Sequence, residues 1–246
     1  MSLPLYTAAE AGALDRAAME AGIPGGVLME RAGETVVARL AARWGLDRLG
    51  RVGVLAGGGN NGGDGYVVAR RLREAGVAVD VIAVGDPGRL QGDAAEAAVR
   101  WRAAGGGVLP PDTPLAPYDL LVDALLGTGL SSEVRSPFRE AVEALAAAPA
   151  PVVAVDVPSG LSADSGQVLG AAAPAELTVT FVGRKRGLFT GDGPDFAGVV
   201  HFDDLGIPEG VRQDHPGSGR LLQAPDAGRP PRPANSHKGL FGRVVV

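Results

Sequence analysis

The sequence contains no cysteine, and only two of its 23 basic residues are lysines. Without cysteine the chain can form no disulfide, no thiolate metal site and no cysteine nucleophile, and this composition fits a reducing cytoplasm. No stretch approaches the roughly 20 consecutive apolar residues that a membrane-spanning helix needs. The first residues lack the basic-then-apolar pattern of a secretion signal. We therefore expect a cytoplasmic protein that makes no membrane contact.

Clustered positive charge is also scarce. The net charge is −5, whereas a nucleic-acid partner demands cations gathered against its phosphates. The three histidines, His201, His215 and His237, lie too far apart in the sequence to suggest a histidine metal site. We therefore expect neither a nucleic-acid partner nor a metal bound by histidine.

The most informative stretch covers residues 51–70 and reads RVGVLAGGGNNGGDGYVVAR. Its β-branched opening predicts a buried strand, and its end predicts a helix. Between them lies a loop of Gly and Asn. Glycine permits positive φ and close approach to a ligand, and free N–H groups at the helix start favour an anion such as phosphate. The sequence therefore opens like a nucleotide-binding β-α unit.

The spacing of Gly57, Gly59 and Gly62 fits the dinucleotide pattern G-x-G-x-x-G. By itself this spacing fits a glycine-rich turn without chemical function equally well. The neighbouring polar residues Asn60, Asn61 and Asp64 are not needed for a tight turn, and they favour a ligand or an ion.

From residue 52 onward, predicted strands and helices alternate. The predicted strands are Val52–Ala56, Val77–Val84, Leu120–Ala124, Val152–Val157, Leu177–Phe181 and Val199–Phe202. The predicted helices are Asp64–Ala75, Gln91–Ala104, Pro137–Ala147 and a weaker one over Gly166–Ala173, preceded by one capped at Thr7 and one over about Gly25–Trp44. This alternation predicts an α/β fold with a Rossmann-like, doubly wound, mostly parallel sheet and helices on both faces. After about Ile207 the Gly- and Pro-rich composition predicts an irregular tail.

Polar residues follow three of the predicted strands, at the edge of the sheet where α/β proteins bind ligands. They are Asn60, Asn61, Asp64, Asp123, Asp156 and Ser159. Each also has a structural explanation, because Asp156 could cap the segment after Pro158, Asp123 could brace its loop, and Ser159 suits a turn. Carboxylates at adjacent strand ends, however, repel each other unless a cation or a proton lies between them.

The oxygen-bearing residues Asn61, Asp123 and Ser159 suit a hard cation, and their low formal charge makes a monovalent ion such as potassium plausible. Asp156 is the best candidate for a general acid/base. Lys185 and Arg186 fit either a phosphate contact or a loop surface.

Several segments together closely resemble the NAD(P)H-hydrate epimerase family (the YjeF N-terminal domain). They read AGGGNNGGDG, DALLGTGLSSEVR, VVAVDVPSGLSAD and TFVGRKRGL followed by GVVHFDDLGIP, and the opening LYTAAEAGALDRAAMEAGIPGGVLMERAG is similar to that family's N-terminal helices. The resemblance covers about residues 3–210. It implies an enzyme that interconverts the R and S forms of hydrated NADH and NADPH, so that a stereospecific dehydratase can restore the cofactor.

The resemblance also implies roles for individual residues. The hydrated dinucleotide would be bound by Asp156 and by two loops, Asn60, Asn61, Gly62, Gly63 and Asp64 in the first and Gly127, Thr128, Gly129, Leu130, Ser131, Ser132 and Glu133 in the second. One potassium ion per subunit would be held by Asn61, Asp123 and Ser159. Asp156 would be the general acid/base, no organic cofactor would be needed, and the protein would form a homo-oligomer.

The last residues carry a second resemblance. SHKGLFGRVVV looks like the first strand of the ADP-dependent NAD(P)H-hydrate dehydratase domain, which has a ribokinase-like fold. We therefore expect an epimerase domain over residues 1–210, followed over 211–246 by a linker and the first strand of a truncated dehydratase domain. The chain would then be the N-terminal half of a bifunctional enzyme.

Two other functions remain open from the residues. An NAD-dependent dehydrogenase would need an acid at the end of the second strand to bind the ribose. Asp80 falls too early in that strand and Asp86 falls after it. A non-catalytic nucleotide-binding or scaffold domain would tolerate loss of the ion and acid residues, all of which are present.

Overall fold

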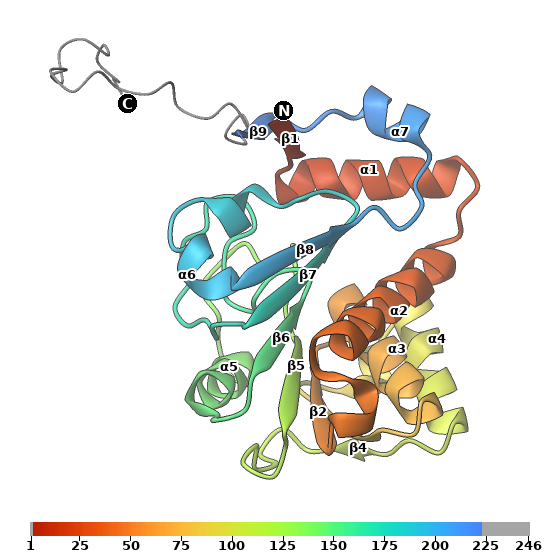
Figure 1. Ribbon diagram of the computed structural model, residues 1–246, viewed down its shortest axis with the longest axis vertical. Coiled ribbons are helices and arrows are strands. Elements are labelled where there is room, and N and C mark those ends of the chain that lie inside the picture. The colour runs from red at the N-terminus through yellow and green to blue at the C-terminus, as the bar shows by residue number, and fades with distance from the viewer. Residues whose placement is uncertain (1, 223–246) are drawn as a thin grey trace, which may run out of the picture.

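The computed structural model describes residues 2–222 (Figure 1). Seven strands form one sheet in the order β4-β3-β2-β5-β6-β7-β8, and all of its pairings are parallel. The strands are β2 Arg51–Ala56, β3 Ala78–Ala83, β4 Val108–Leu109, β5 Leu120–Ala124, β6 Val152–Val155, β7 Leu177–Phe181 and β8 Val199–Asp203. The predicted doubly wound sheet is confirmed. Its order reverses between β2 and β5, which is the point where such sheets bind ligands.

Helices cover both faces of this sheet, also as predicted. The helices of the described residues are α1 Ala8–Glu20, α2 Gly25–Trp44, α3 Asn60–Glu74, α4 Gly92–Ala103, α5 Phe138–Ala147, α6 Gly193–Ala197 and α7 Glu209–Asp214. In Figure 1, α2, α3 and α4 lie on one side of the sheet and α5 lies on the other. None of the helices within residues 2–222 combines the length and apolarity needed to cross a bilayer.

Successive side chains of each strand point to opposite faces of the sheet, so the sheet divides the core in two. In β5, for example, Leu120 and Val122 join the core under α2, α3 and α4, whereas Leu121 joins the core under α5. Both faces of the central strands are therefore apolar, which explains why the sequence shows near-continuous runs of Val, Leu and Ala there.

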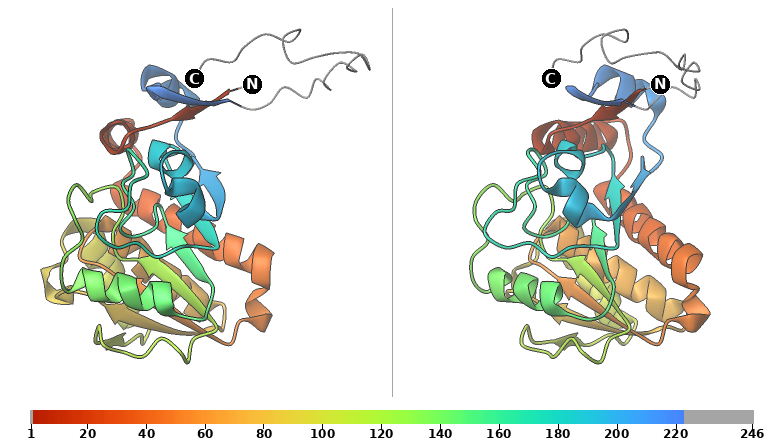
Figure 2. Two further views of the ribbon diagram at one scale, coloured as in Figure 1. Left: turned by 90° about the vertical axis from the view of Figure 1, so that its left-hand side faces the viewer. Right: turned by 60° about the vertical axis from the view of Figure 1, so that its left-hand side comes forward.

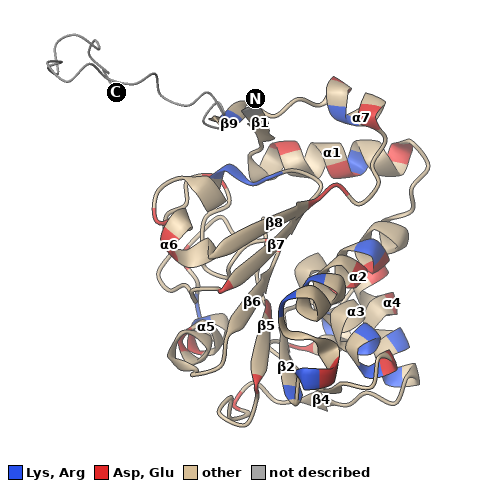
Figure 3. Cartoon of the chain, viewed as in Figure 1, with Lys and Arg blue, Asp and Glu red and all other residues tan. Residues whose placement is uncertain are grey.

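The charged residues of α2, α3 and α4 pair with one another across the solvent side of these helices (Figure 3). Glu30 of α2 accepts from Arg70 and Arg71 of α3 and, at 3.0 Å, from Arg100 of α4. The charges of Arg70 and Arg71 are thus neutralised by neighbouring carboxylates.

Two predictions for the chain's path were wrong. Residues 166–173 form no helix, because Gly166 and Gly170 both take positive φ (73° and 87°). The segment also hydrogen-bonds to the residues before it, with the Leu169 N–H donating to the Gly160 carbonyl at 2.8 Å. The residues after Ile207 are not irregular throughout, since they include α7 and the strand β9, Gly219–Leu222.

Strand β9 pairs antiparallel with β1, Ser2–Leu5, so the two ends of the described chain meet. Figure 2 shows this small sheet together with α1 and α7 as a layer at one end of the main sheet. The strand expected over Phe241–Val246 lies outside the described residues.

Candidate active site

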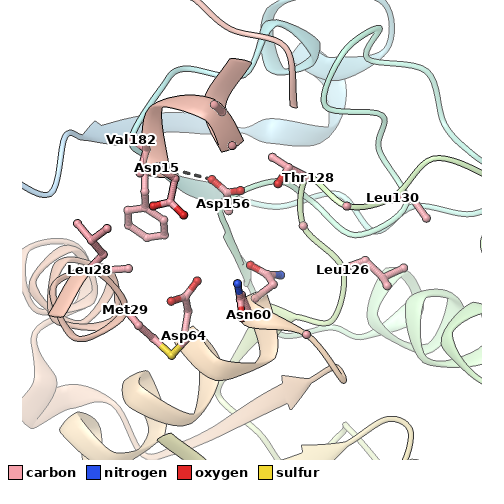
Figure 4. Close-up of a pocket in the computed structure, with 18 of the residues that line it drawn as sticks. Asp15, Leu28, Met29, Asn60, Asp64, Leu126, Thr128, Leu130, Asp156 and Val182 are labelled. Atoms are coloured by element: carbon pink, nitrogen blue, oxygen red, sulfur yellow. Dashed lines mark hydrogen bonds between the residues drawn. The ribbon is translucent and has the colours of Figure 1, made fainter. Parts of the chain in front are cut away.

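A cavity of about 800 Å³ opens where β2, β5, β6 and β7 end, with α1 and α2 on its other side (Figure 4). The segments that follow these strands supply most of its wall, so the cavity coincides with the point of strand-order reversal. The predicted residues that line it are Asn60, Asn61, Asp64, Gly127, Thr128, Gly129, Leu130, Ser131, Ser132 and Asp156. Of the other predicted binding residues, Gly62 and Gly63 are buried behind the loop, and Glu133 is exposed to solvent outside the cavity.

The glycine loop works by close backbone packing. None of the glycines between positions 57 and 65 has positive φ, so the expectation that they supply this conformation was wrong. A Cβ on Gly57 would lie 2.0 Å from the Leu125 carbonyl oxygen, and one on Gly62 would lie 2.0 Å from the Gly57 carbonyl oxygen. Gly58 and Gly59, by contrast, line the cavity, and a Cβ there would meet nothing within 4 Å.

Helix α3 begins at Asn60, four residues before its predicted start, and no side chain caps it. The N–H groups of its first turn therefore lie at the cavity wall, where the helix dipole favours an anion. This geometry supports the phosphate-binding role predicted for the loop.

The predicted oxygen cluster gathers around residues 125–127. Asp123 is fully buried and accepts hydrogen bonds from the Ser159 N–H at 2.8 Å and the Ser159 hydroxyl at 2.5 Å. The Leu126 N–H donates to the Ser159 Oγ at 2.9 Å. Burial raises the pKa of Asp123, and the bonds from Ser159 oppose this rise.

Asn61 approaches the same segment from α3. A Cβ on Gly127 would lie 3.3 Å from the Asn61 side chain, so the two residues are neighbours. The Oδ1 and Nδ2 atoms of Asn61 are buried without a hydrogen-bond partner among the described residues. Orphaned buried amides are uncommon in folded proteins and point to a missing ligand or ion.

Asp156 follows β6 directly and has φ 69°, an unfavourable conformation for a residue with a Cβ. The other non-glycine residues of positive φ in the described chain, Val182 and Leu205, line the same cavity. Asp156 Oδ1 accepts from Thr180 Oγ1 at 3.2 Å, from the Phe181 N–H at 3.3 Å and from Lys185 Nζ. Within the described residues these donors all reach Oδ1, which leaves Oδ2 without a donor.

Lys185 was not identified from the sequence as a partner of Asp156. The residue is buried, only 3% exposed, and its side chain also donates to the Phe181 carbonyl at 2.7 Å. It therefore does not belong to a loop surface. The sequence feature that could have drawn attention to it is the residue type, because the basic residues of this chain are otherwise almost all arginine.

Three further aspartates line the cavity: Asp64 from α3 and Asp15 from α1, which Figure 4 shows, and Asp93 from α4. Burial raises the pKa of Asp64 well above its usual value, and the negative charges of Asp156 and Asp15 add to this rise. Burial also raises the pKa of Asp15. Asp15 was not recognised from the sequence, since an acidic residue on an amphipathic helix ordinarily faces solvent.

Residues 25–187 match the model of the family described as YjeF-related protein N-terminus. The chain belongs to this family. As a YjeF-related domain it carries within the matched segment the loop residues from Asn60 onward, the oxygen cluster, Asp156 and Lys185, whereas α1 with Asp15 lies before it.

Curated relatives agree with this assignment, and a solved structure shares the fold. The chain is 41% identical over 245 residues to the bifunctional NAD(P)H-hydrate repair enzyme Nnr of Coxiella burnetii, covering 98% of this chain and 50% of that protein. It is 41% identical over 203 residues to the enzyme of the same name from Escherichia coli, covering 78% and 38%. The chain thus spans about half or less of the length of these relatives. The crystal structure of the yeast protein YNL200c has the same fold, with a TM-score of 0.76, 23% identity and coverage of 92% and 98%.

Proposed function

We propose that this YjeF-related domain interconverts the R and S forms of hydrated NADH and NADPH. The observation that carries the proposal is the Asp156–Lys185 pair at the floor of a cavity built on the strand-order reversal of a dinucleotide-binding sheet. Relatives at 41% identity are named NAD(P)H-hydrate repair enzymes, which supports the same substrate.

The chemistry needs a proton donor and acceptor beside one carbon atom. In the hydrated ring, C6 carries a hydroxyl group next to the ring nitrogen, and the nitrogen lone pair can expel the protonated hydroxyl as water. The planar iminium that remains can take up water from its other face, which inverts the centre. Asp156 can serve this exchange through Oδ2, because Lys185, Thr180 and the Phe181 N–H hold Oδ1 and fix the carboxyl in place.

The remaining wall would bind the rest of the dinucleotide. The start of α3 offers backbone N–H groups to its phosphates, and the loop Gly127–Ser132 lines the neighbouring wall. Glu133 is exposed and does not line the cavity, and we include it in the binding loop only through its neighbours.

We propose that Asn61, Asp123 and Ser159 hold a potassium ion. The orphaned Asn61 Oδ1, the buried Asp123 carboxyl and the Ser159 hydroxyl fit a cation of low charge. Residues 2–222 contain no group of three or more His, Asp or Glu side chains that could hold a metal ion, so the proposed site depends on amide and hydroxyl oxygens beside one carboxylate. When bound, the ion would supply positive charge that neutralises Asp123 and fixes the loop at residues 125–127.

The rest of the functional picture is also proposed. Because relatives of twice the length are named bifunctional, we propose that this domain, residues 1–210, works beside an ADP-dependent dehydratase domain that begins after a linker. We further propose a cytoplasmic homo-oligomer.

The two rival functions fit less well. For a dehydrogenase, neither candidate ribose acid lines the cavity: Asp80 is paired with Arg51 at 2.7 Å, and Asp86 caps a short turn through the Gly88 N–H. A scaffold domain would have no need for the strained, ion-paired Asp156.

The test is epimer exchange on isolated R hydrate, followed by NMR or chiral chromatography. We expect the protein to bring the R/S mixture to equilibrium faster than the spontaneous reaction, with no change in redox state. Formation of oxidised or reduced cofactor would favour a dehydrogenase. Binding of the hydrate without accelerated exchange would favour the scaffold.

A further inference from the structure

Strained backbone conformations gather at one side of the cavity. Asp156, Val182 and Leu205, with φ of 69°, 66° and 54°, follow the neighbouring strands β6, β7 and β8. All three residues line the cavity. Residues in such sparsely populated conformations persist only where the surrounding structure holds them, and they cluster at functional sites. The ends of these three strands therefore share a role at the cavity.

Asp156 and Val182 are held in the same kind of turn. At Val182, the Gly183 N–H donates to the Phe181 carbonyl at 2.6 Å. At Asp156, the N–H of the following residue donates to the carbonyl of the preceding residue at 2.9 Å. A bond across one residue of positive φ makes a γ-turn of the rare, strained form. Two adjacent strands thus end in the same way, one with a carboxyl group and the other with an isopropyl group.

Valine is an unfavourable residue for this turn. A branched side chain at positive φ is a genuine outlier, whereas glycine adopts this conformation without strain. The fold holds Val182 there: its N–H donates to the Asp203 carbonyl at 3.0 Å, and Arg31 of α2 donates to the Leu205 carbonyl of the next strand end at 2.6 Å. The isopropyl group therefore contributes something that glycine could not.

Val182 belongs to an apolar wall of the cavity. We define this wall as Leu28, Met29, Val182 and Leu205, which are all buried and all line the cavity. In Figure 4 the labelled members of the wall lie on one side of Asp156, whereas Thr128 and Leu130 lie on the other. Asp156 thus stands between an apolar wall and the loop proposed to bind the dinucleotide.

We propose that the nicotinamide ring of the hydrated dinucleotide lies between Asp156 and this apolar wall, with its C6 edge toward Asp156 and its opposite edge against Val182. The inference rests on the proposed epimerase function and adds the orientation of the substrate. The start of α3 and the loop of residues 127–132 would hold the ADP-ribose part, so the ring extends past Asp156 to the other side.

This orientation suits the reaction. Inversion passes through a planar iminium, so water must reach both faces of C6. A wall against the opposite edge of the ring leaves both faces open and keeps C6 beside the carboxyl of Asp156. Val182 is therefore a positioning residue, which holds the reacting carbon in place and takes no part in proton transfer.

The chemistry of the space also matches the ring. Its apolar carbon atoms gain from contact with the buried side chains of the wall. Its carboxamide carries N–H donors, and the carboxyl groups of Asp15 and Asp64, which line the same cavity, offer acceptors (Figure 4).

The contribution of the ring to binding tests the proposal without turnover. NADH contains the ring and ADP-ribose lacks it, so the ratio of their Kd values, measured by calorimetry, reports the ring alone. Wild type should bind NADH at least about 10-fold more tightly than ADP-ribose. Val182→Gly keeps the turn, since glycine accepts positive φ. It should weaken NADH about 10-fold and leave ADP-ribose unchanged.

Three further variants, each checked for folding by circular dichroism, separate the wall from the rest of the molecule. Leu28→Ala shortens the wall from α2 without touching the turn, so it should also lower the preference for NADH. Leu130→Ala, on the other side of Asp156, should weaken both ligands equally. Val199→Ala is the matched control, because Val199 is exposed on β8 and does not line the cavity. It should change neither affinity.

Epimer exchange gives a second readout. At saturating hydrate, Val182→Gly should exchange about 10-fold more slowly than wild type, because C6 is no longer held beside Asp156. Val199→Ala should keep the wild-type rate.

The inference is overturned if wild type binds NADH no more tightly than ADP-ribose, or if Val182→Gly and Leu28→Ala leave the ratio unchanged. Equal weakening of both ligands by these variants would place the ADP-ribose part against the wall and equally contradict it. Absence of exchange by wild type, with the ratio falling as expected, would remove the epimerase function and still support this position of the ring.

Discussion

At the residue scale, the site depends on one buried ion pair. Asp156 stands at positive φ directly after β6, and Lys185 reaches it from the segment after β7. Both side chains are largely enclosed, with 13% of the Asp156 side chain and 4% of the Lys185 side chain exposed. Removing one member therefore leaves the other as an unpaired buried charge.

We accordingly expect Lys185→Met to lower the free energy of unfolding by about 3 kcal/mol and to abolish epimer exchange. Arg139→Met is the control, because Arg139 pairs with Glu143 at 3.1 Å on an exposed helix surface. That change should cost no more than about 0.5 kcal/mol. Urea unfolding measures both. Equal small losses would mean that Asp156 does not depend on Lys185.

The buried Asp123 predicts how potassium and pH act together. Its pKa in the folded chain is raised above the usual 3.8, so the folded state binds this proton more tightly than the unfolded state does. The resulting stabilisation is complete below about pH 3.8 and is lost as the pH rises through the folded pKa. A cation bound beside the ionised carboxylate would restore it.

Potassium should therefore raise the melting temperature more at pH 8 than at pH 4, relative to choline buffer of equal ionic strength. Comparing potassium with choline at each pH removes the contribution of groups such as Glu74, whose lowered pKa changes stability with pH in the opposite direction. Ser159→Ala removes one proposed ligand and should blunt the response. A potassium effect that is equal at both pH values would argue against an ion at Asp123.

Single residues were the least predictable part of the site from sequence. Asp156, Asp123 and Ser159 could be found because strand ends meet at one edge of a parallel sheet. Asp15 could not, since nothing in the pattern of α1 shows that the helix crosses the cavity mouth. Lys185 required knowledge that the chain turns back after β7 beneath Asp156.

At the element scale, the strand–loop–helix unit from β2 to α3 positions the ligand site. Sequence reasoning located this unit but misjudged its glycines, because the same residue type serves positive φ, close packing and ligand access. Only the paths of neighbouring segments distinguish these uses. Gly62 abuts a carbonyl of its own loop, whereas Gly58 faces open space.

These two glycines give a matched pair of variants. Gly62→Ala would place a Cβ 2.0 Å from the Gly57 carbonyl oxygen, and the backbone there can move away only at a large cost in free energy. We expect it to destabilise the protein by about 3 kcal/mol. Gly58→Ala meets nothing within 4 Å and should change stability by less than about 0.5 kcal/mol. Thermal unfolding of both variants measures these changes. Similar losses of stability in the two variants would contradict the packing role of Gly62.

Regular elements were otherwise well predicted where the apolar pattern was long. The six strands predicted for the main sheet all exist, and the missed strands are β4, which has only two residues, and the two strands of the small sheet, β1 and β9. The end of β6 came two residues earlier than expected because Asp156 leaves the extended conformation. The failed helix over residues 166–173 has alanines that suit a helix, but its glycines adopt turns fixed by contacts far along the chain.

At the scale of the whole molecule, the chain closes on itself through β1 and β9 above the active site. No local pattern predicts this pairing, because it joins residues about 200 positions apart and β9 lies in a Gly-rich segment. Removing residues 1–5 should therefore free the amides of β9 to exchange hydrogen at the rate of unstructured peptide, while those of β2 and β5 stay protected. Continued protection of β9 would show that β1 does not hold it.

Epimer exchange on the isolated R hydrate in potassium buffer, with wild type beside Asp156→Ala, tests the proposed epimerase function. We expect rapid approach to the R/S mixture by wild type and only the spontaneous rate with Asp156→Ala, although the variant still binds the hydrate. Equal acceleration by both proteins would contradict the role of Asp156, and no acceleration by wild type would contradict the epimerase function of this domain.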